Sequence, residues 1–314
     1  MTGWPDRPRA LVSYAYITTP ALPDPLPTWD ILIDSGAFTA YTSGKTIDRA
    51  AYTDWLAANA GRYTAAFALD VIGDPTASLA NYEWQRSALR GTGVTLIPTW
   101  HMGAPWDVLE SMCQTAGYVS IGGMVPYFRR RPLLMRNCIR AHQIARNHGV
   151  RLHGLGASGS TVRQLPWYSV DSSSWAMPRR QPVVYVADQH GTMRTIQRGN
   201  GKDARRHAST LRRYGLNPTE YATYGSSTAK RVGKDEARSR TDRAVVASAR
   251  SYMWSEAANP TGTLIYLATS PGATGPIGQA WADGPPYPRA HRTTSAPPRD
   301  DQAKAHNSDQ GADE

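Results

Sequence analysis

Cysteine is scarce in this chain of 314 residues, in which only Cys113 and Cys138 occur. Two isolated cysteines exclude a Cys-rich zinc site, because such a site takes three or four clustered ligands. They also exclude a disulfide framework and are typical of a reducing compartment. We therefore expect a cytoplasmic protein that has no cysteine-bound metal.

Long apolar runs are also lacking. No stretch approaches the roughly 18 apolar residues that a membrane helix needs, and the mean hydropathy is negative. The first ten residues, MTGWPDRPRA, contain no apolar stretch of the signal-peptide kind. The sequence therefore predicts a protein that neither spans a membrane nor is exported.

Acidic residues are fewer than basic ones, since 25 Asp and Glu stand against 35 Lys and Arg, a net charge of +10. Residues 271–314 hold four of the basic and six of the acidic residues, so residues 1–270 carry about +12. A basic body favours a polyanionic partner such as nucleic acid. The alternative is a charged surface that only keeps the chain in solution.

The C-terminal segment 271–314 is poor in large apolar side chains and holds seven prolines and five glycines. Such a composition buries too little apolar surface to offset the entropy lost on ordering. We expect a disordered tail over this range.

Short apolar runs alternate with segments of helical spacing along most of the chain. This alternation is typical of parallel βα units, and eight strands favour a closed (β/α)8 TIM-like barrel of the α/β class over an open sheet. The expected strands span 11–17, 31–34, 65–71, 94–99, 118–121, 151–155, 167–171 and 263–269. The expected helices span 48–60, 75–90, 105–116, 132–148 and 235–257.

The alternation stops between residues 176 and 234, which we interpret as a basic insertion late in the barrel. Residues 182–197, around His190-Gly191, are expected to form a hairpin. The insertion is expected to hold phosphates, while Tyr214, Tyr221 and Tyr224 stack on unpaired bases. The arginines singled out for nucleic-acid binding are Arg179, Arg180, Arg205, Arg206, Arg212 and Arg213.

Polar residues stand where several expected strands end. In a (β/α)8 barrel the working residues lie at the C-terminal ends of the strands and in the loops that follow. Asp34, Asp70 and Asp171 occupy such places, and Gly122 and Gly123 follow the fifth strand. A single Asp there more often caps the next helix, but three of them on one rim indicate an active site.

Four segments within residues 30–175 resemble, in order, motifs of the tRNA-guanine (queuine) transglycosylase family. Asp34-Ser35-Gly36-Ala37-Phe38 resembles the family's Asp-Ser-Gly-Gly-aromatic signature, and Leu69-Asp70 resembles its second aspartate segment. Ile121-Gly122-Gly123-Met124 is similar to the glycine-pair loop, and Val170-Asp171 to the nucleophile strand. The resemblance implies a transglycosylase barrel over residues 1–270.

Two departures from the family's usual pattern indicate which branch of the family the chain resembles. The family's zinc-binding Cys-x-Cys-x-x-Cys is absent, and the chain is shorter than a typical bacterial tRNA enzyme. Both features look like the phage and genomic-island branch that inserts 7-deazaguanines into DNA. The resemblance thus implies a DNA-modifying enzyme that needs no metal or redox cofactor and takes a free base such as preQ0 (7-cyano-7-deazaguanine).

The resemblance also implies a role for each site residue. Asp171 would attack C1′ of the target nucleotide, and Asp34 would act as general acid/base toward N9 of the base. Asp70 would accept hydrogen bonds from a guanine-like ring, the N–H groups of Gly122 and Gly123 would reach its O6, and Phe38 would stack on it. The expected base-binding residues are Ser35, Gly36, Phe38, Asp70, His101, Gly122, Gly123 and Met124.

Three other interpretations stay open. In the first, the polymer substrate is tRNA instead of DNA, although the missing zinc module counts against this. In the second, the protein is a retaining glycoside hydrolase, although that class typically uses Glu at its strand ends. In the third, the protein is a non-catalytic nucleic-acid-binding barrel, although such a protein has no need of the Asp34 and Asp171 pair.

Overall fold

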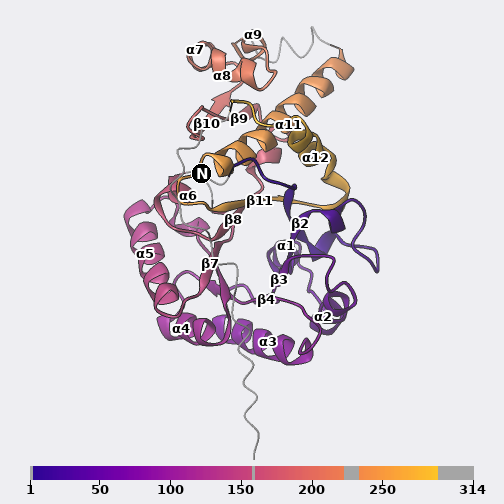
Figure 1. Ribbon diagram of the computed structural model, residues 1–314, viewed down its shortest axis with the longest axis vertical. Coiled ribbons are helices and arrows are strands. Elements are labelled where there is room, and N and C mark those ends of the chain that lie inside the picture. Colours follow the sequence, from indigo (N-terminus) through magenta and orange to yellow (C-terminus); the bar gives the residue numbers. More distant parts are fainter. Residues whose placement is uncertain (1–2, 158–159, 223–232, 289–314) are drawn as a thin grey trace, which may run out of the picture.

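The computed structural model describes residues 3–157, 160–222 and 233–288 of the chain. A nearly closed sheet of nine parallel strands forms the centre, in the order β4-β3-β2-β1-β11-β8-β7-β6-β5 (Figure 1). These strands are β1 (Arg9–Ser13), β2 (Asp30–Asp34), β3 (Ala65–Phe67), β4 (Leu96–Ile97), β5 (Thr99–His101), β6 (Tyr118–Gly122), β7 (Arg151–Gly154), β8 (Ser169–Ser172) and β11 (Leu264–Thr269). The fold is therefore of the α/β class with a TIM-like barrel.

Pro98 separates β4 from β5 and lies where the two ends of the sheet meet. Pro98 has no N–H to donate to a neighbouring strand. Ile97 O still accepts from Ala68 N on the β3 side (2.8 Å), and Pro98 O accepts from Ser120 N on the β6 side (2.9 Å). Backbone hydrogen bonds therefore run from β3 through this short segment to β6.

Helices surround the sheet on its outer side (Figure 1). All eight predicted strand segments and all five predicted helical segments overlap an observed element of the same kind. None of the described helices is long and apolar enough to cross a membrane. The helices around the sheet are α1 (Ala37–Thr42), α2 (Arg49–Ala58), α3 (Pro75–Ala88), α4 (Trp106–Thr115), α5 (Arg131–Asn147), α6 (Ser160–Gln164) and α11 (Lys234–Ala257).

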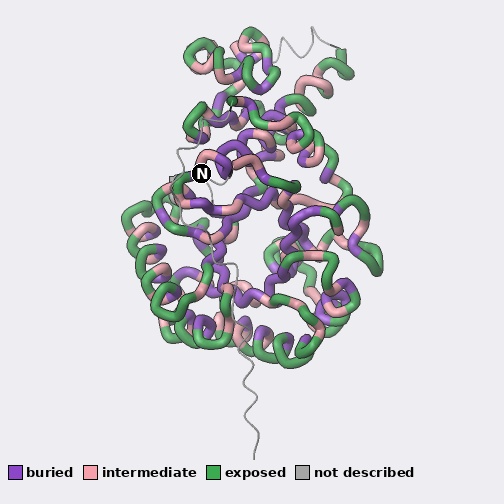
Figure 2. The backbone as a smooth tube through the Cα atoms, in the orientation of Figure 1, coloured by how far each residue is buried: buried purple, intermediate pink, exposed green. Residues whose placement is uncertain are grey.

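The apolar core has two layers because strand side chains alternate between the two faces of the sheet. The layer between sheet and helices holds most of the buried residues, including Ile31, Ile33 and Val119. A smaller cluster inside the ring contains Leu32 and Phe67. Figure 2 shows the strands buried within the ring and the exposed residues on the outer helices.

The N-terminal end of the ring is closed by a buried polar network. Asp30 accepts hydrogen bonds from Arg9 Nε (3.1 Å), Thr64 Oγ1 (2.6 Å) and the Tyr266 hydroxyl (2.9 Å). Arg9 also pairs with Glu256 of α11 at 2.5 Å. Because these polar groups bind one another, they close this end of the ring. The opposite end carries the C-terminal ends of the strands.

The predicted insertion is a subdomain beside the barrel. The hairpin is confirmed, because β9 (Val183–Ala187) and β10 (Met193–Gln197) pair antiparallel. Three short helices follow, α7 (Gly201–Arg206), α8 (Ala208–Arg213) and α9 (Pro218–Ala222). Residues of the hairpin and these helices form a separate core with Ala244 and Ala247 of α11.

The predicted disordered tail is wrong for residues 271–288. These residues form a turn (η5, Pro271–Ala273) and the helix α12 (Gly275–Ala282). Ile277 and Ala280 are fully buried, and Trp281 Nε1 donates to Pro5 O at 2.9 Å. The overall composition of the tail hid this local apolar stripe at spacing i, i+3, i+4. The rest of the predicted tail, 289–314, lies outside the described residues.

Candidate active site

Asp34 stands at the end of β2, and the glycine two residues later holds it there. Gly36 N donates to Asp34 Oδ2 at 3.1 Å. Gly36 has φ +80°, and a Cβ at this position would lie 2.6 Å from Ala15 Cβ and 2.8 Å from Ala15 N. Only glycine fits this left-handed, closely packed position. The local sequence therefore brings the start of α1 against the turn after β1 and fixes the Asp34 carboxyl.

The environment of Asp34 suits proton transfer near neutral pH. Burial raises the pKa of Asp34 to about 7, and the negative charges of Asp70 and Asp171 act in the same direction. The N–H of Gly36 opposes this rise by donating to the carboxylate. A carboxyl with a pKa near the working pH holds and releases a proton readily, which is the property of a general acid/base.

Asp70 follows β3 and is bound by two other side chains. Ser35 Oγ donates to Asp70 Oδ1 at 3.1 Å, and His101 Nε2 donates to Oδ2 at 2.8 Å. A Cβ on Gly122 would lie 3.0 Å from His101 Cδ2, so the glycine makes room for the imidazole. Ser35, Asp70, His101 and Gly122, four of the predicted base-binding residues, thus form one connected group.

Asp171 lies on β8 and is 7% exposed. Gly156 N donates to its Oδ1 at 2.7 Å, and His153 Nε2 donates to the same oxygen at 3.2 Å. Two N–H donors hold one carboxylate oxygen and leave the other oxygen without a protein hydrogen bond that the structure shows. This arrangement orients the carboxylate.

His153 extends the hydrogen bonds of Asp171 into the barrel. The His153 side chain is fully buried, and its Nδ1 shares a hydrogen bond with Ser169 Oγ at 2.6 Å. Ser169 Oγ also shares a hydrogen bond with the Tyr118 hydroxyl. Because a carboxylate oxygen only accepts, Nε2 of His153 carries a proton toward Asp171. His153 was expected near the end of the sixth strand but had no predicted role, because its contact with Asp171 depends on the pairing of β7 with β8.

The three aspartates lie at one end of the barrel, because β2, β3 and β8 run parallel and each aspartate is at or beyond the C-terminal half of its strand. Their charges interact at Asp34. Phe38 at the start of α1 is 67% exposed, whereas Met124 is 3% exposed and packs in the main core. The structure thus brings the aspartates together and leaves Phe38 accessible, while Met124 is largely a packing residue.

The six predicted nucleic-acid-binding arginines are exposed but lie elsewhere. Arg179 and Arg180 stand at the end of the turn η4 (Ser174–Arg179), and the other four belong to α7 and α8. Figure 1 shows α7 and α8 beyond the barrel, at one extremity of the molecule. Their part in binding stays a prediction.

The tyrosines of the insertion do not form the predicted stacking surface. Tyr214 is 6% exposed and Tyr221 is 2% exposed, and both belong to the core of the insertion. Their rings are needed there because the short helices supply few large apolar side chains. Tyr224 lies outside the described residues.

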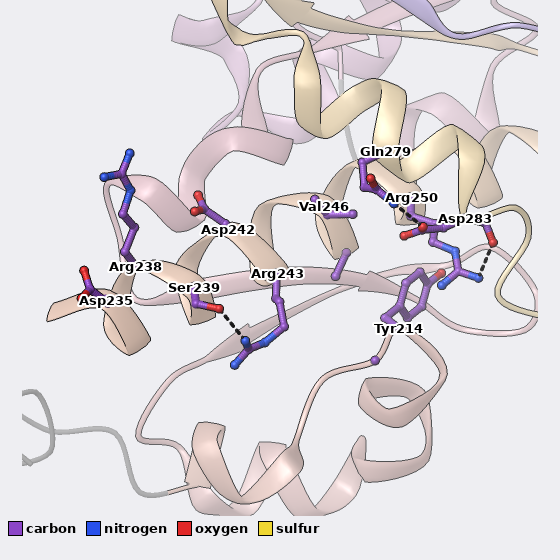
Figure 3. Close-up of a pocket in the computed structure, with 12 residues that line it drawn as sticks. Tyr214, Asp235, Arg238, Ser239, Asp242, Arg243, Val246, Arg250, Gln279 and Asp283 are labelled. Carbon is purple, nitrogen blue, oxygen red and sulfur yellow. Dashed lines mark hydrogen bonds between the residues drawn. The ribbon is translucent and has the colours of Figure 1, made fainter. Parts of the chain in front are cut away.

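Two hollows lie away from the aspartates. One, of about 610 Å³, lies between Tyr214, α11 and α12 (Figure 3). Its charges alternate in sign, and Arg250 is already bound to Gly284 O at 2.6 Å. The other, of about 840 Å³, lies between α5 and the N-terminal ends of β7 and β8. The first is lined by Asp235, Asp242 and Asp283 interleaved with arginines, and the lining of the second contains no Asp or Glu. Asp34, Asp70 and Asp171 instead meet at one end of the barrel, which is the candidate active site.

Among the described residues, no group of three or more His, Cys, Asp or Glu side chains is arranged to hold a metal ion. The candidate active site contains three aspartates, two histidines and backbone N–H groups. A scan of known protein-family models and a search of curated proteins find no match to this chain.

Proposed function

We propose that this chain is a transglycosylase related to the tRNA-guanine transglycosylases, which exchanges guanine in DNA for a 7-deazaguanine base such as preQ0. The observation that carries the proposal is Asp34, whose pKa is raised to about 7 beside the charges of Asp70 and Asp171. A base exchange needs one carboxylate as nucleophile and one carboxyl that handles a proton, and this end of the barrel offers both.

The architecture supports the proposal. β4 and β5 are separated by the single residue Pro98, and β4 pairs with β3 while β5 pairs with β6. Counted as one interrupted strand, they give eight parallel strands, as in a (β/α)8 barrel. The site then occupies the strand ends where such barrels carry their chemistry.

The first half of the reaction breaks the glycosidic bond. The second carboxylate oxygen of Asp171 attacks C1′ of the target nucleotide, the C1′–N9 bond breaks, and its electron pair goes to N9. Asp34 in its protonated form supplies a proton to the departing guanine. The product is a covalent ester between Asp171 and the sugar.

The second half restores the enzyme. The carboxylate of Asp34 takes the N9 proton of the incoming base, N9 attacks C1′, and the C1′–oxygen bond of the ester breaks. Two displacements at C1′ retain its configuration. Because Asp34 gives a proton in one half and takes one in the other, a pKa near the working pH serves both.

Base recognition uses the group around Asp70. Each oxygen of a carboxylate accepts more than one hydrogen bond, so the contacts from Ser35 and His101 leave room for the N1–H and amine of a guanine-like ring. Phe38 offers an exposed ring for stacking, and the N–H groups of Gly122 and Gly123 serve the O6 carbonyl. A guanine must leave the base stack to reach this end of the barrel.

The test is to trap the covalent intermediate. A labelled guanine-containing oligonucleotide incubated without free base should give a slow-migrating band on a denaturing gel with wild-type protein and none with Asp171→Asn. Asp74→Asn is the matched control, because Asp74 caps α3 by accepting from Ala77 N and asparagine also caps helices. A band from Asp171→Asn would contradict the proposed nucleophile.

Nucleoside mass spectrometry of DNA and RNA from cells that express the protein identifies the polymer. We expect a 7-deazaguanine nucleoside in DNA. Its appearance only in RNA would assign the protein to tRNA, and unmodified nucleic acid with free base supplied would overturn the proposed exchange.

A further inference from the structure

Exposed apolar side chains gather around the mouth of the barrel. Of the seven large apolar residues that are exposed in the described chain, two lie on the outer helices α3 and α5, namely Trp84 and Ile139. The other five follow the C-terminal ends of β1, β2 and β6. We call these five residues the apolar rim: Tyr16, Phe38, Tyr41, Val125 and Phe128.

The apolar rim flanks the aspartates from two sides. Tyr16 ends the turn η1 (Tyr14–Tyr16) after β1, and Phe38 and Tyr41 lie on α1 after β2. Val125 and Phe128 follow β6, beside the turn η3 (Val125–Tyr127). Around the sheet, β3 and β4–β5 lie between β2 and β6 in one direction, and β1, β11, β8 and β7 lie between them in the other. The two halves of the apolar rim therefore face each other across the mouth.

Positive charge accompanies the β6 side of the rim. Arg129, Arg130 and Arg131 follow Phe128 directly, and all three are exposed. Arg131 also donates to Gln164 Oε1 at 3.2 Å. Residues 111–170 contain eight arginines and no Asp or Glu. At the mouth, Arg129 and Arg130 therefore offer exposed guanidinium groups to an anion without competing carboxylates from their own segment.

Exposed rings beside exposed arginines match the chemistry of one ligand class. Unpaired bases stack on aromatic rings whatever their sequence, and the phosphates between them bind arginine. A duplex offers neither face of its bases. A target nucleotide that enters the mouth has a flanking nucleotide on each side of it. The two halves of the apolar rim lie on these two sides.

We propose that single-stranded DNA lies across the mouth of the barrel, with the bases that flank the target nucleotide stacked on Tyr41 on one side and on Phe128 on the other, and with phosphates bound by Arg129 and Arg130. This inference rests on the proposed function, because it places the flanking strand around the same site. It assigns the first contact with DNA to the apolar rim and not to the insertion.

The test is fluorescence anisotropy with a labelled single-stranded DNA of about 8 nucleotides, in the Asp171→Asn background so that no chemistry occurs. Tyr41→Ala and Phe128→Ala should each weaken binding about 10-fold, since stacking contributes about 1–2 decades of affinity per base. The double variant Arg129→Ala/Arg130→Ala should lower the salt slope by about 1.4, or about 0.7 per phosphate.

Matched controls separate the rim from general surface effects. Trp84→Ala and Ile139→Ala remove exposed apolar residues on α3 and α5, and Arg90→Ala removes an exposed arginine; all should bind as the parent protein does. Wild-type affinity in both aromatic variants would overturn the inference. Tighter binding of duplex DNA or of RNA of the same sequence would also overturn it, and so would loss of self-association in Phe128→Ala, which would make the rim an interface between copies.

The insertion gives a second comparison. Replacing Arg205, Arg206, Arg212 and Arg213 with Ala should leave the affinity for this short strand unchanged, and a loss as large as that of the rim variants would return the contact to the insertion. Failure of the inference and of the proposed function are distinguishable. Rim-dependent binding without base exchange would contradict only the function, and exchange with rim-independent binding would contradict only the inference.

Discussion

At the residue scale, aspartates that stand beside the ends of strands and helices have different roles because their hydrogen-bond partners differ. Asp48 and Asp74 each accept from a backbone N–H three residues later, at 2.9 Å, and so cap α2 and α3. Asp70 and Asp171 instead bind side chains and N–H groups from other strands. A short stretch of sequence shows only the backbone N–H that a capping aspartate binds. The partners of Asp70 and Asp171 come together only in the assembled barrel.

The raised pKa of Asp34 predicts how stability depends on pH. Because the folded protein holds this proton more tightly than the unfolded chain, the free energy of unfolding should fall as the pH rises from about 4 to about 7. Asp34→Asn should remove the Asp34 part of this decline and be more stable than wild type at about pH 8, while base exchange is lost; the part due to Glu256, whose pKa burial also raises to about 7, should remain. Urea unfolding at several pH values measures this, with Asp74→Asn as control. The same pH dependence in wild type and Asp34→Asn would contradict the assignment.

His153 predicts a positioning effect on the nucleophile. His153→Ala leaves Asp171 with the N–H of Gly156 alone, so kcat for base exchange should fall about 10- to 100-fold, the range that a small misplacement of a reacting group costs. The KM for free base should change little, because the hydrogen bonds of His153 go to Asp171 and Ser169 and not to Asp70. His153→Gln, which restores an N–H donor, should recover part of kcat. A lower melting temperature with unchanged kcat would show that His153 is only a packing residue.

At the element scale, the junction between β2 and α1 shows how a short helix is specified. α1 has only six residues, too few for a recognisable apolar period, and it was not predicted from the sequence. The long helices α2 to α5 and α11 were predicted because each repeats its apolar pattern over several turns. The short helices α6 to α9 escaped prediction for the same reason as α1.

Two glycines with positive φ near this junction give a matched prediction. Gly44→Ala adds a Cβ that meets no atom within 4 Å at φ +66°, so it should cost about 1–2 kcal/mol of backbone strain. Gly36→Ala has similar strain and also drives its Cβ into Ala15, so it should cost more and impair base exchange through Asp34. Unfolding and exchange assays on both variants measure this. Full activity in Gly36→Ala would mean that Asp34 does not depend on the turn.

At the scale of the whole molecule, the order of elements and the three aspartates were predictable, because apolar periodicity and strand-end position are local properties. The contacts within the site were not, since His153 meets Ser169 only through the register of β7 with β8. The charge distribution shows a similar limit. The arginines of the insertion and of residues 111–170 are both visible in sequence, but only the fold shows that Arg129 and Arg130 follow β6 at the same end of the barrel as the aspartates.

The helix α11 serves more than one core. Ala244 and Ala247 pack in the core of the insertion, and Val245, Ala249 and Met253 pack in the main core of the barrel. This one helix of 24 residues thus contributes side chains to both cores, and the loss of either core would remove packing that holds the helix in place. Insertion and barrel should consequently melt in one cooperative transition, because the two cores share one rigid helix.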